Sequence, residues 1–358
     1  MQRLNFGRCW VGNGEPTYFI ADISANHDGD LSRAKALIHL AAEAGANAAK
    51  FQNFQAPKLV SSCGFASLGK QISHQAQWKK PVYQIYQEAT LPWEWTEILR
   101  AECDVVRIDY FSTPYDLDAV DMLDPFVLVF KIGSGDITWP EMLQKVATKG
   151  KPVILATGAS SMDEVHRAVK IIGADNPQII LMQCNTNYTG SVDNFRHIHL
   201  NVLKAYALLF PEVILGLSDH TPGYTTVLGA VALGAKVVEK HFTDNTEREG
   251  PDHPFSMTPV GWREMVDRTR ELESALGSAI KRVVENEKET VVLQRRCLRA
   301  AQDFSAGTIL RRNLIEVLRP APEDAIFPYD LAKVIGMRVR KDVSAGQYLR
   351  WTMLELAP

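Results

Sequence analysis

Short apolar runs alternate with polar loops and amphipathic stretches through the first three quarters of the chain. Eight of the runs are rich in β-branched or aromatic residues and are predicted to be strands: 18–24, 48–54, 109–115, 128–134, 152–158, 178–185, 213–220 and 236–243. Amphipathic stretches lie between them, among them 31–45, 139–150 and 162–173. Strands that alternate with helices predict a parallel sheet, because parallel neighbours need a long crossover connection.

The stretch 31–45 illustrates why these segments are predicted to be helices. Its apolar residues recur at helical spacing and share one face: Leu31, Ala34, Leu37, Ile38 and Ala41. Gly45 ends the pattern. In 139–150, Pro140 stands near the predicted helix start, where its missing N–H group costs nothing.

Eight strand–helix units within about 280 residues predict an α/β fold, the (β/α)8 TIM barrel. A doubly wound open sheet is the competing architecture. It is disfavoured because no glycine-rich dinucleotide fingerprint follows the first predicted strand.

The pattern changes near residue 280. Residues 281–293 are charged and carry no strand signal, so we predict a barrel domain at 1–280, a linker at 281–293 and a small β-rich domain at 294–358. Within the last, DFSAGTIL (303–310) and DVSAGQYL (342–349) form a near-repeat that predicts internal pseudo-symmetry. A segment this small is expected to pack against the barrel or a partner chain for stability.

Net charge, hydropathy and cysteine content indicate which partners and which cellular location to expect. A formal net charge of −3 over 358 residues argues against a nucleic-acid partner. No apolar run approaches the roughly 20 residues of a membrane helix, and the first 20 residues lack a signal-peptide core, so no membrane partner is expected. Five cysteines without a CxxC pair fit reduced thiols, which predicts a cytoplasmic protein.

In a TIM barrel, functional side chains lie where strands end, at the carboxyl face. The predicted strand ends are unusually polar: Asp22, Lys50, Gln52, Thr113, Tyr115, Lys131, Ser134, Thr157, Tyr188, Ser218, His220 and His241. Lys50 and Lys131 fall inside strands, where a buried ammonium without a partner costs several kcal/mol. Either each lysine pairs with an internal acid such as Glu239, or both converge on a phosphate or carboxylate of a substrate.

The sequence KIGSG (131–135) favours the anion-binding alternative. Ser134 and its flanking glycines offer a hydroxyl and accessible backbone N–H groups to phosphate oxygens. Thr113 and Ser218, at matching strand ends, add hydroxyls of the same kind. Cys184, in contrast, is expected to be a small buried residue because no base is evident beside it.

Two histidines, His220 and His241, end neighbouring predicted strands. A lone histidine is more often a structural hydrogen-bonding residue, but two neutral imidazoles with open positions suit a divalent transition metal. Glu239 shares a strand face with His241 and is placed to orient it or an accompanying water. Other histidines show no such convergence and are expected at the surface or in packing: His39, His74, His166, His197 and His199.

The loop after the last predicted strand, DNTEREGPDHPFSM (244–257), contains a Gly250–Pro251 turn. The turn is expected to hold Arg248 and Asp252 near the barrel mouth. The alternative is an ordinary solvated loop.

Several motifs that contain these residues resemble the sialic acid synthase family. They are ISANHDGDLSRAKALIHLAAEAGANAAKFQNF, FSTPY, KIGSGDI, KPVILATGAS, GLSDHT, ALGAKVVEKHFT and GPDH. The likeness covers nearly the whole chain, and its last part is similar to an antifreeze-like (SAF) domain. The resemblance implies a TIM barrel that condenses phosphoenolpyruvate with an N-acetylated hexosamine and water, giving a nonulosonic acid and phosphate.

The resemblance also implies individual roles. Asp22, Lys50 and Lys131 would be catalytic, and the phosphoenolpyruvate would bind to Lys50, Thr113, Lys131, Ser134 and Ser218. The acceptor sugar would meet Tyr115, Tyr188, Asp252 and Arg319, the last reaching across from the other subunit of a domain-swapped homodimer. His220 and His241 would hold a divalent metal ion, with Mn²⁺ expected first and Mg²⁺ or Co²⁺ as alternatives.

The chain departs from the family pattern at several positions. Asp22 stands where the family usually has glutamate, Ala156 replaces a serine seen in some members, and Thr186 replaces an asparagine. The stretch 63–88 matches poorly and is expected to form part of the acceptor wall.

Several activities stay open at this stage. N-acetylmannosamine is the first acceptor expected; the alternatives are a synthase of the legionaminic or pseudaminic type and one that accepts a sugar phosphate. A Schiff-base aldolase that uses Lys50 or Lys131 as nucleophile is a second enzyme class. A noncatalytic carbohydrate-binding protein is the third alternative.

Overall fold

The computed structural model describes residues 3–357, in two compact units that divide between Gly277 and Ser278. The first unit contains an eight-stranded sheet in which every neighbouring pair of strands is parallel. Its strands are β3 (Tyr18–Asp22), β4 (Ala48–Asn53), β5 (Asp109–Pro114), β6 (Phe130–Ile132), β7 (Val153–Ala156), β8 (Ile179–Cys184), β9 (Ile214–Asp219) and β10 (Val237–His241). Each lies within one of the eight predicted runs.

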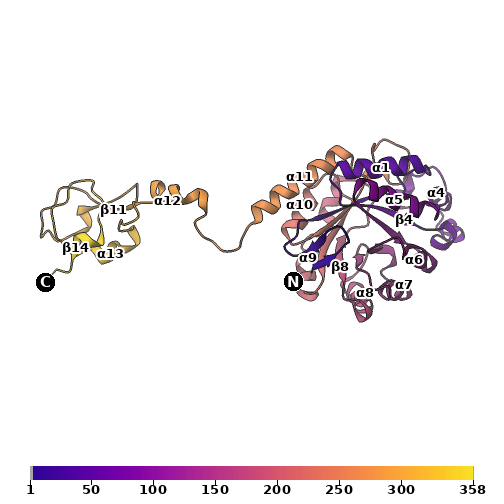
Figure 1. The fold of residues 1–358 in the computed structure, drawn as a ribbon, viewed down its shortest axis with the longest axis horizontal. Helices are drawn as coiled ribbons and strands as arrows, with labels where there is room; N and C mark the ends of the chain where they lie inside the picture. The colour runs from indigo at the N-terminus through magenta and orange to yellow at the C-terminus, as the bar shows by residue number, and fades with distance from the viewer. Residues whose placement is uncertain (1–2, 358) are drawn as a thin grey trace. The chain divides into compact units, whose positions relative to one another are not determined.

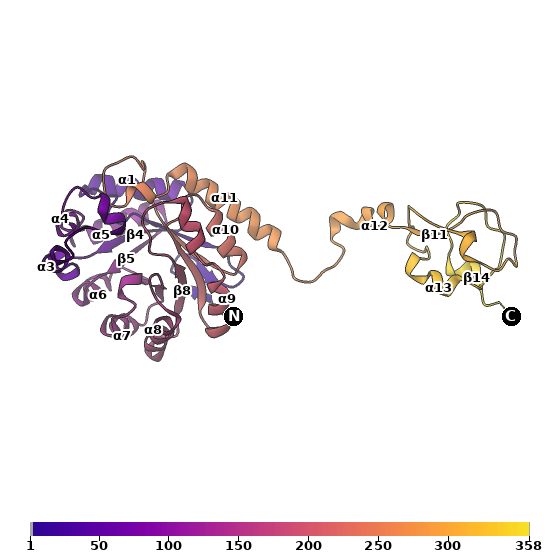
Figure 2. The same ribbon diagram turned by 180° about the vertical axis from the view of Figure 1, so that it is seen from behind.

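The sheet closes into a barrel. The strand order is β5-β4-β3-β10-β9-β8-β7-β6, so the last strand of the unit, β10, pairs with the first, β3. The two ends of this order, β5 and β6, lie against each other. Helices surround the strands on the outside (Figures 1 and 2). The prediction of a (β/α)8 TIM barrel is therefore confirmed.

The helices of the first unit follow the strands in the expected alternation. They are α1 (Leu31–Glu43), α2 (Ala56–Leu59), α3 (Ser62–Ser67), α4 (Val82–Glu88), α5 (Trp95–Val106), α6 (Leu117–Leu123), α7 (Pro140–Ala147), α8 (Met162–Asp175), α9 (Val202–Leu209), α10 (Thr225–Ala232) and α11 (Pro259–Leu276). In α1, the side chain of Asp30 accepts hydrogen bonds from the first-turn N–H groups of Ser32 and Arg33. Its apolar face is buried against the barrel, as the spacing predicted.

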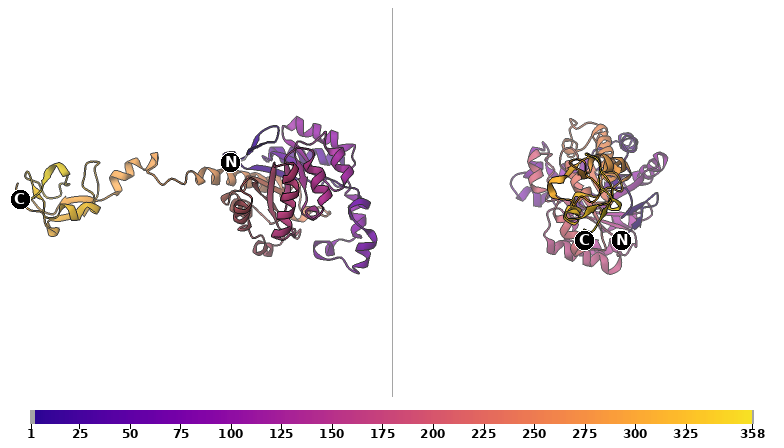
Figure 3. Two further views of the ribbon diagram at one scale, coloured as in Figure 1. Left: turned by 90° about the horizontal axis from the view of Figure 1, so that it is seen from below. Right: turned by 90° about the vertical axis from the view of Figure 1, so that its left-hand side faces the viewer.

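A hairpin that the sequence analysis did not predict seals the amino end of the barrel. Its strands β1 (Arg3–Asn5) and β2 (Trp10–Gly12) are antiparallel and short, which leaves little periodicity to detect. Phe6 is fully buried, and its ring packs edge-on against Tyr18 and Phe111 at centroid distances of 5.1 and 5.8 Å. In the left panel of Figure 3 the hairpin and the helices α2–α4 lie at opposite ends of the barrel.

The second unit has two small antiparallel sheets and a hydrophobic core of its own. One sheet pairs β11 (Cys297–Ala300) with β12 (Ile315–Leu318), and the other pairs β13 (Arg338–Val339) with β14 (Leu354–Glu355). A short helix, α13 (Leu331–Val334), packs its Val334 into that core. Residues 281–293, predicted to be a linker, include most of the helix α12 (Lys288–Gln294).

The two near-repeats of the second unit bind each other reciprocally. Phe304 and Val343 exchange backbone hydrogen bonds of 2.8 and 2.9 Å. Asp303 accepts from the N–H of Ala345, and Asp342 accepts from the N–H of Ala306, both at 2.8 Å. The predicted pseudo-symmetry is therefore present in the hydrogen bonding itself.

Among residues 3–357, no helix has the length and hydropathy needed to cross a bilayer.

Because the hairpin seals the barrel, a mutation in it should lower the free energy of unfolding far more than a mutation on the exposed surface. Replacing Phe6 by alanine should cost about 3–5 kcal/mol, because the change opens a cavity at the closed end of the barrel. The matched control Leu208→Ala removes a side chain that is 83% exposed and should change stability by less than about 0.5 kcal/mol. Urea unfolding followed by tryptophan fluorescence measures both; equal midpoints would contradict a structural role for the hairpin.

Candidate functional site

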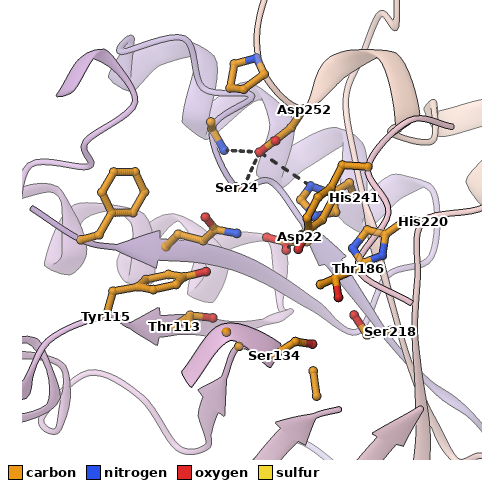
Figure 4. Close-up of a pocket in the computed structure, with 18 of the residues that line it drawn as sticks. Asp22, Ser24, Thr113, Tyr115, Ser134, Thr186, Ser218, His220, His241 and Asp252 are labelled. Atoms are coloured by element: carbon orange, nitrogen blue, oxygen red, sulfur yellow. Dashed lines mark hydrogen bonds and ion pairs between the residues drawn. The ribbon is translucent and has the colours of Figure 1, made fainter. Parts of the chain in front are cut away.

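A cavity of about 570 Å³ lies at the carboxyl ends of the barrel strands. The structure brings eleven of the twelve predicted site residues to its wall: Asp22, Lys50, Thr113, Tyr115, Lys131, Ser134, Tyr188, Ser218, His220, His241 and Asp252. Most of them are drawn in Figure 4. Arg319, the twelfth, is an exposed residue of the second unit, and its role stays a prediction.

Two lysines and two acids form a buried cluster of four charges on the cavity wall. Lys50 Nζ lies 2.8 Å from Asp22 Oδ2 and 3.9 Å from Glu239 Oε2. Lys131 Nζ lies 2.9 Å from Glu239 Oε1. All four side chains are at most 4% exposed. The interpretation that each lysine pairs with an internal acid is therefore confirmed. Because both lysines also line the cavity, their binding of a substrate anion stays a prediction.

Lys50 and Glu239 stay charged because their neighbours in the cluster offset the effect of burial. Burial alone would lower the pKa of Lys50, but the carboxylates of Asp22 and Glu239 outweigh it and raise that pKa above its usual value. Burial would raise the pKa of Glu239, whereas the ammonium groups of Lys131 and Lys50 lower it to about 2. At neutral pH, Lys50 and Glu239 are thus held as ions in a site almost free of water contact.

Hydroxyl groups surround the lysines, as predicted. Lys50 Nζ donates to Thr113 Oγ1 at 3.4 Å, and Ser218 Oγ donates to Glu239 Oε1 at 3.2 Å. Ser134 Oγ accepts from the N–H of Gly158 at 2.9 Å. These hydroxyls belong to different strand ends, which is how a barrel brings groups distant in sequence around one ligand.

Thr157 does not reach this site, although it also follows a strand end. Its hydroxyl donates a hydrogen bond to the carbonyl of Met182 in β8 and accepts one from Tyr206 in α9. The side chain of Thr157 therefore bonds to these two elements and does not line the cavity. Cys184 does line the cavity and is buried, and burial raises the pKa of its thiol. The expectation that Cys184 is a small buried residue is therefore confirmed.

The two predicted metal ligands, His220 and His241, lie side by side, with ring centroids 5.4 Å apart. Nδ1 of His220 lies 3.0 Å from the carbonyl oxygen of Asn185, so this nitrogen carries the proton and Nε2 keeps a lone pair. Burial, with help from His241, lowers the pKa of His220 to about 3, which keeps the ring neutral. Nδ1 of His241 is buried and has no hydrogen-bond partner.

These features fit a divalent ion in an open site. Neutral imidazoles with free lone pairs are suitable ligands, and an unpartnered buried nitrogen calls for a partner. Oδ1 of the neighbouring Asp22 is likewise buried without a hydrogen bond, and its Oδ2 lies 3.5 Å from His241 Nε2. Among residues 3–357, no group of three or more His, Cys, Asp or Glu side chains is arranged for a metal, and the divalent ion stays a prediction.

The loop after β10 holds Asp252 at the cavity, as predicted. Ser24 Oγ donates to Asp252 Oδ2 at 2.5 Å, and the N–H of Ala25 donates to the same oxygen at 3.3 Å. Arg248, expected at the mouth, binds Asp28 at 2.7 Å.

The fully buried His253 also anchors the loop that carries Asp252. Its Nε2 lies 2.8 Å from Asp28 Oδ1, and its Nδ1 lies 2.7 Å from Thr243 Oγ1. The loop is thus tied down rather than free in solvent.

The segment 62–89 contributes to the cavity through His74, Trp78, Ile85 and Tyr86. Residues of 63–88 therefore line the cavity, and their role as part of an acceptor wall stays a prediction. The expectation that His74 is a surface or packing residue was wrong. The error has a physical cause: no periodic pattern indicates which side chains of an irregular insertion point inward. The rings of His74 and Tyr188 are in contact at 5.0 Å.

The sequence analysis also did not single out Asp136, which lines the cavity. Burial raises the pKa of its carboxyl to about 6. It follows Ser134 in the KIGSGDI motif, at the end of a short 3-10 turn, so its position past a strand end was the one available signal. Ala156 and Thr186, two departures from the family pattern, line the same cavity.

The four-charge cluster predicts strongly non-additive mutations. Glu239→Gln should cost about 3–5 kcal/mol, because it leaves Lys131 as a buried ammonium with no close counter-charge. The double variant Lys131→Met/Glu239→Gln replaces a charged pair by a neutral one and should lie within about 1.5 kcal/mol of the unaltered protein. Chemical denaturation of the single and double variants measures this coupling.

Acid unfolding gives a second measurement of the same cluster. Since the folded-state pKa of Glu239 is depressed, its contribution to stability is present above the usual value of 4.5 and is lost as the pH falls toward about 2. The double variant should lose less stability over that range. A double variant as unstable as Glu239→Gln alone would contradict this account of the pair.

Comparisons with known proteins agree with this geometry. A family model described as the NeuB family matches residues 37–281, and a SAF domain model matches residues 295–355. The N,N'-diacetyllegionaminic acid synthase of Campylobacter jejuni is 32% identical, over 91% of this chain and 98% of that protein. The N-acetylneuraminate-9-phosphate synthase of Homo sapiens is 31% identical, over 92% of this chain and 90% of that protein.

A solved structure extends the likeness to three dimensions. The crystal structure of N-acetylneuraminic acid (sialic acid) synthetase from Leptospira borgpetersenii, in complex with citrate, matches with a TM-score of 0.71 and 28% identity. The match covers 81% of this chain and 95% of that one. The chain is therefore an enzyme of the NeuB family that carries a C-terminal SAF domain.

Proposed function

We propose that this enzyme condenses phosphoenolpyruvate with an N-acetylated hexosamine and water, giving a nonulosonic acid and inorganic phosphate. N-acetylmannosamine is the first acceptor to test. The observation that carries the proposal is the joint placement of two buried ammonium groups and two imidazoles on one cavity. Two relatives, a synthase of N-acetylneuraminate 9-phosphate and a synthase of diacetyllegionaminic acid, support the same class of product.

The lysine side of the cavity suits phosphoenolpyruvate. Lys50 and Lys131 would bind its phosphate and carboxylate through charge-assisted hydrogen bonds, which are stronger in a site shielded from water. Thr113, Ser134 and Ser218 would donate hydroxyl hydrogens to the remaining oxygens. Asp22 and Glu239 hold the ammonium groups in position before the substrate arrives.

The proposed reaction forms two bonds and breaks one. C3 of phosphoenolpyruvate donates its electron pair to the aldehyde carbon of the open-chain sugar, whose oxygen becomes a hydroxyl. Water adds its oxygen to C2, and the bridging C2–O bond breaks as phosphate leaves with one proton of that water and C2 becomes a ketone. The other proton of the water is released and ends on the sugar oxygen. Asp22, which lies 2.8 Å from Lys50 and 3.5 Å from His241, would accept that proton.

His220 and His241 would hold the divalent ion, Mn²⁺ in the first instance, with Mg²⁺ or Co²⁺ as alternatives. When bound, such an ion supplies a Lewis acid that polarises the acceptor aldehyde. Tyr188 packs edge-on against His220 at 4.5 Å and keeps that ring in place.

Tyr115, Tyr188 and Asp252 are proposed to meet the acceptor, with Arg319 added from the partner subunit of a domain-swapped homodimer. This arrangement would close the cavity against water. A cytoplasmic location belongs to the same proposal, since phosphoenolpyruvate is made inside cells.

A Schiff-base aldolase is the second candidate, and the electrostatics disfavour it. A lysine nucleophile must lose its proton, which requires a lowered pKa, whereas the pKa of Lys50 is raised by its two carboxylate neighbours. Borohydride trapping of a pyruvate adduct, detected as added mass, would support this candidate instead. A noncatalytic sugar-binding role leaves the buried lysines and histidines without a purpose.

Metal removal tests the proposed chemistry. With phosphoenolpyruvate and N-acetylmannosamine, phosphate release and product mass should be lost after treatment with a chelator and restored by Mn²⁺. His220→Ala and His241→Ala should each abolish restoration and weaken Mn²⁺ binding by at least about tenfold, measured directly by electron paramagnetic resonance. His39→Ala, at a histidine that pairs with Glu102 on the outer helices, is the matched control. Full activity in chelator would contradict the metal-dependent scheme.

A further inference from the structure

We infer that the acceptor is an uncharged hexosamine, without a phosphate group, whose end remote from the aldehyde packs on an apolar aromatic wall. This inference rests on the proposed function and concerns the acceptor half of the same cavity. The named relatives leave the point open, because one makes a 9-phosphate and the other a diacetyl sugar acid.

Five rings in successive contact make up the aromatic wall, which we define as His74, Trp78, Tyr86, Phe54 and Tyr115. The centroid distances along it are 5.5 Å from His74 to Trp78, 6.3 Å from Trp78 to Tyr86, 5.6 Å from Tyr86 to Phe54 and 5.9 Å from Phe54 to Tyr115. All five line the cavity.

Further apolar side chains add to the lining of the cavity: Leu59, Ile85, Ala89 and Pro251. The aromatic wall begins next to the histidine pair, because the ring of His74 touches Tyr188, which in turn packs on His220. An acceptor whose aldehyde lies at the histidines would therefore extend its other end along the aromatic wall.

The charges of the cavity disfavour a second phosphate. Among the described residues that line it, the lysines are Lys50 and Lys131 and there is no arginine. Both lysines already face acids, and in the proposed function they also bind phosphoenolpyruvate. The other charged groups near the aromatic wall are the carboxyls of Asp136 and Asp252. A phosphate placed there would lose its hydration and face like charge without a counter-ion.

Three cations of the segment 62–89 and the Asp252 loop each bind an acid and lie outside the cavity lining, and Lys70 of the same segment is exposed and also lies outside it. Lys79 binds Glu249 at 2.6 Å, and Lys80 binds Glu88 at 2.8 Å. Arg248 binds Asp28 at 2.7 Å. Their side chains are at least 42% exposed, so water rather than the cavity surrounds them.

His74 gives an independent indication of a neutral ligand. Its Nδ1 is buried and has no hydrogen-bond partner in the described structure. Burial lowers the pKa of this imidazole below its usual value, so the ring is neutral at neutral pH. A neutral ring can exchange a hydrogen bond with a hydroxyl or an acetamido group but provides no positive charge for a phosphate.

The test compares acceptors on the full chain, so that Arg319, the cation expected from outside the barrel, is present. With phosphoenolpyruvate and Mn²⁺, kcat/KM is measured for N-acetylmannosamine, its 6-phosphate and a 2,4-diacetamido-2,4,6-trideoxyhexose. The better uncharged acceptor should exceed the 6-phosphate by at least about 100-fold, which corresponds to the cost of an unpaired buried charge. A 6-phosphate that is equal or preferred would overturn the inference.

Binding separates this inference from the proposed function. Calorimetric titration of the same three sugars requires no turnover. Selective binding of an uncharged sugar without any turnover would reject the proposed function and keep the inference. Preferential binding of the 6-phosphate, or binding of none of the three, would overturn the inference.

Variants locate the effect on the aromatic wall. Trp78→Ala should raise KM for the uncharged acceptor at least about tenfold and leave KM for phosphoenolpyruvate unchanged. The matched control Trp10→Ala, at the opposite end of the barrel, should change neither constant. Ile85→Arg adds a cation to the aromatic wall and should shift the preference toward the 6-phosphate. An equal loss with both substrates in Trp78→Ala would indicate a structural role and would contradict the inference.

Discussion

The site depends on mutual compensation among four buried charges: Lys50, Lys131, Asp22 and Glu239. None of these groups could be buried alone without a cost of several kcal/mol. In this cluster two lysine side chains are matched by two acidic side chains. The pairs connect β3, β4, β6 and β10, so the cluster also fixes the relative positions of strand ends that are far apart in the sequence.

Structural features at both ends of the barrel stabilise the cavity. At the amino end, the hairpin closes the barrel with Phe6 and its apolar neighbours, which keeps the interior dry. At the carboxyl end, a second charged network around Asp28 holds the loop that carries Asp252, and the segment 62–89 adds three of the five rings of the aromatic wall. The groups proposed to react therefore stand on strands or directly after them, and the groups proposed to contact the acceptor stand mostly in the segments that follow, where sequence can vary without loss of the barrel.

The barrel and most of the site follow from local patterns in the sequence. Each of the eight apolar runs contains one strand, and eleven of the twelve proposed site residues line one cavity, because a barrel brings strand ends together whatever their separation in sequence. The hairpin was missed because its strands have three residues each. His74 and Asp136 were missed because burial in irregular chain is set by tertiary packing and leaves no periodic signal. The role of Arg319 was expected to require a second chain and stays a prediction.

Binding of phosphoenolpyruvate alone tests the central claim most directly. Calorimetric titration should give clear binding to the unaltered protein and at least about 100-fold weaker binding to Lys131→Met/Glu239→Gln, which keeps the neutrality of the cluster but removes one ammonium group. Equal affinity in the two proteins would show that the lysine pair stabilises the barrel and does not bind the substrate anion.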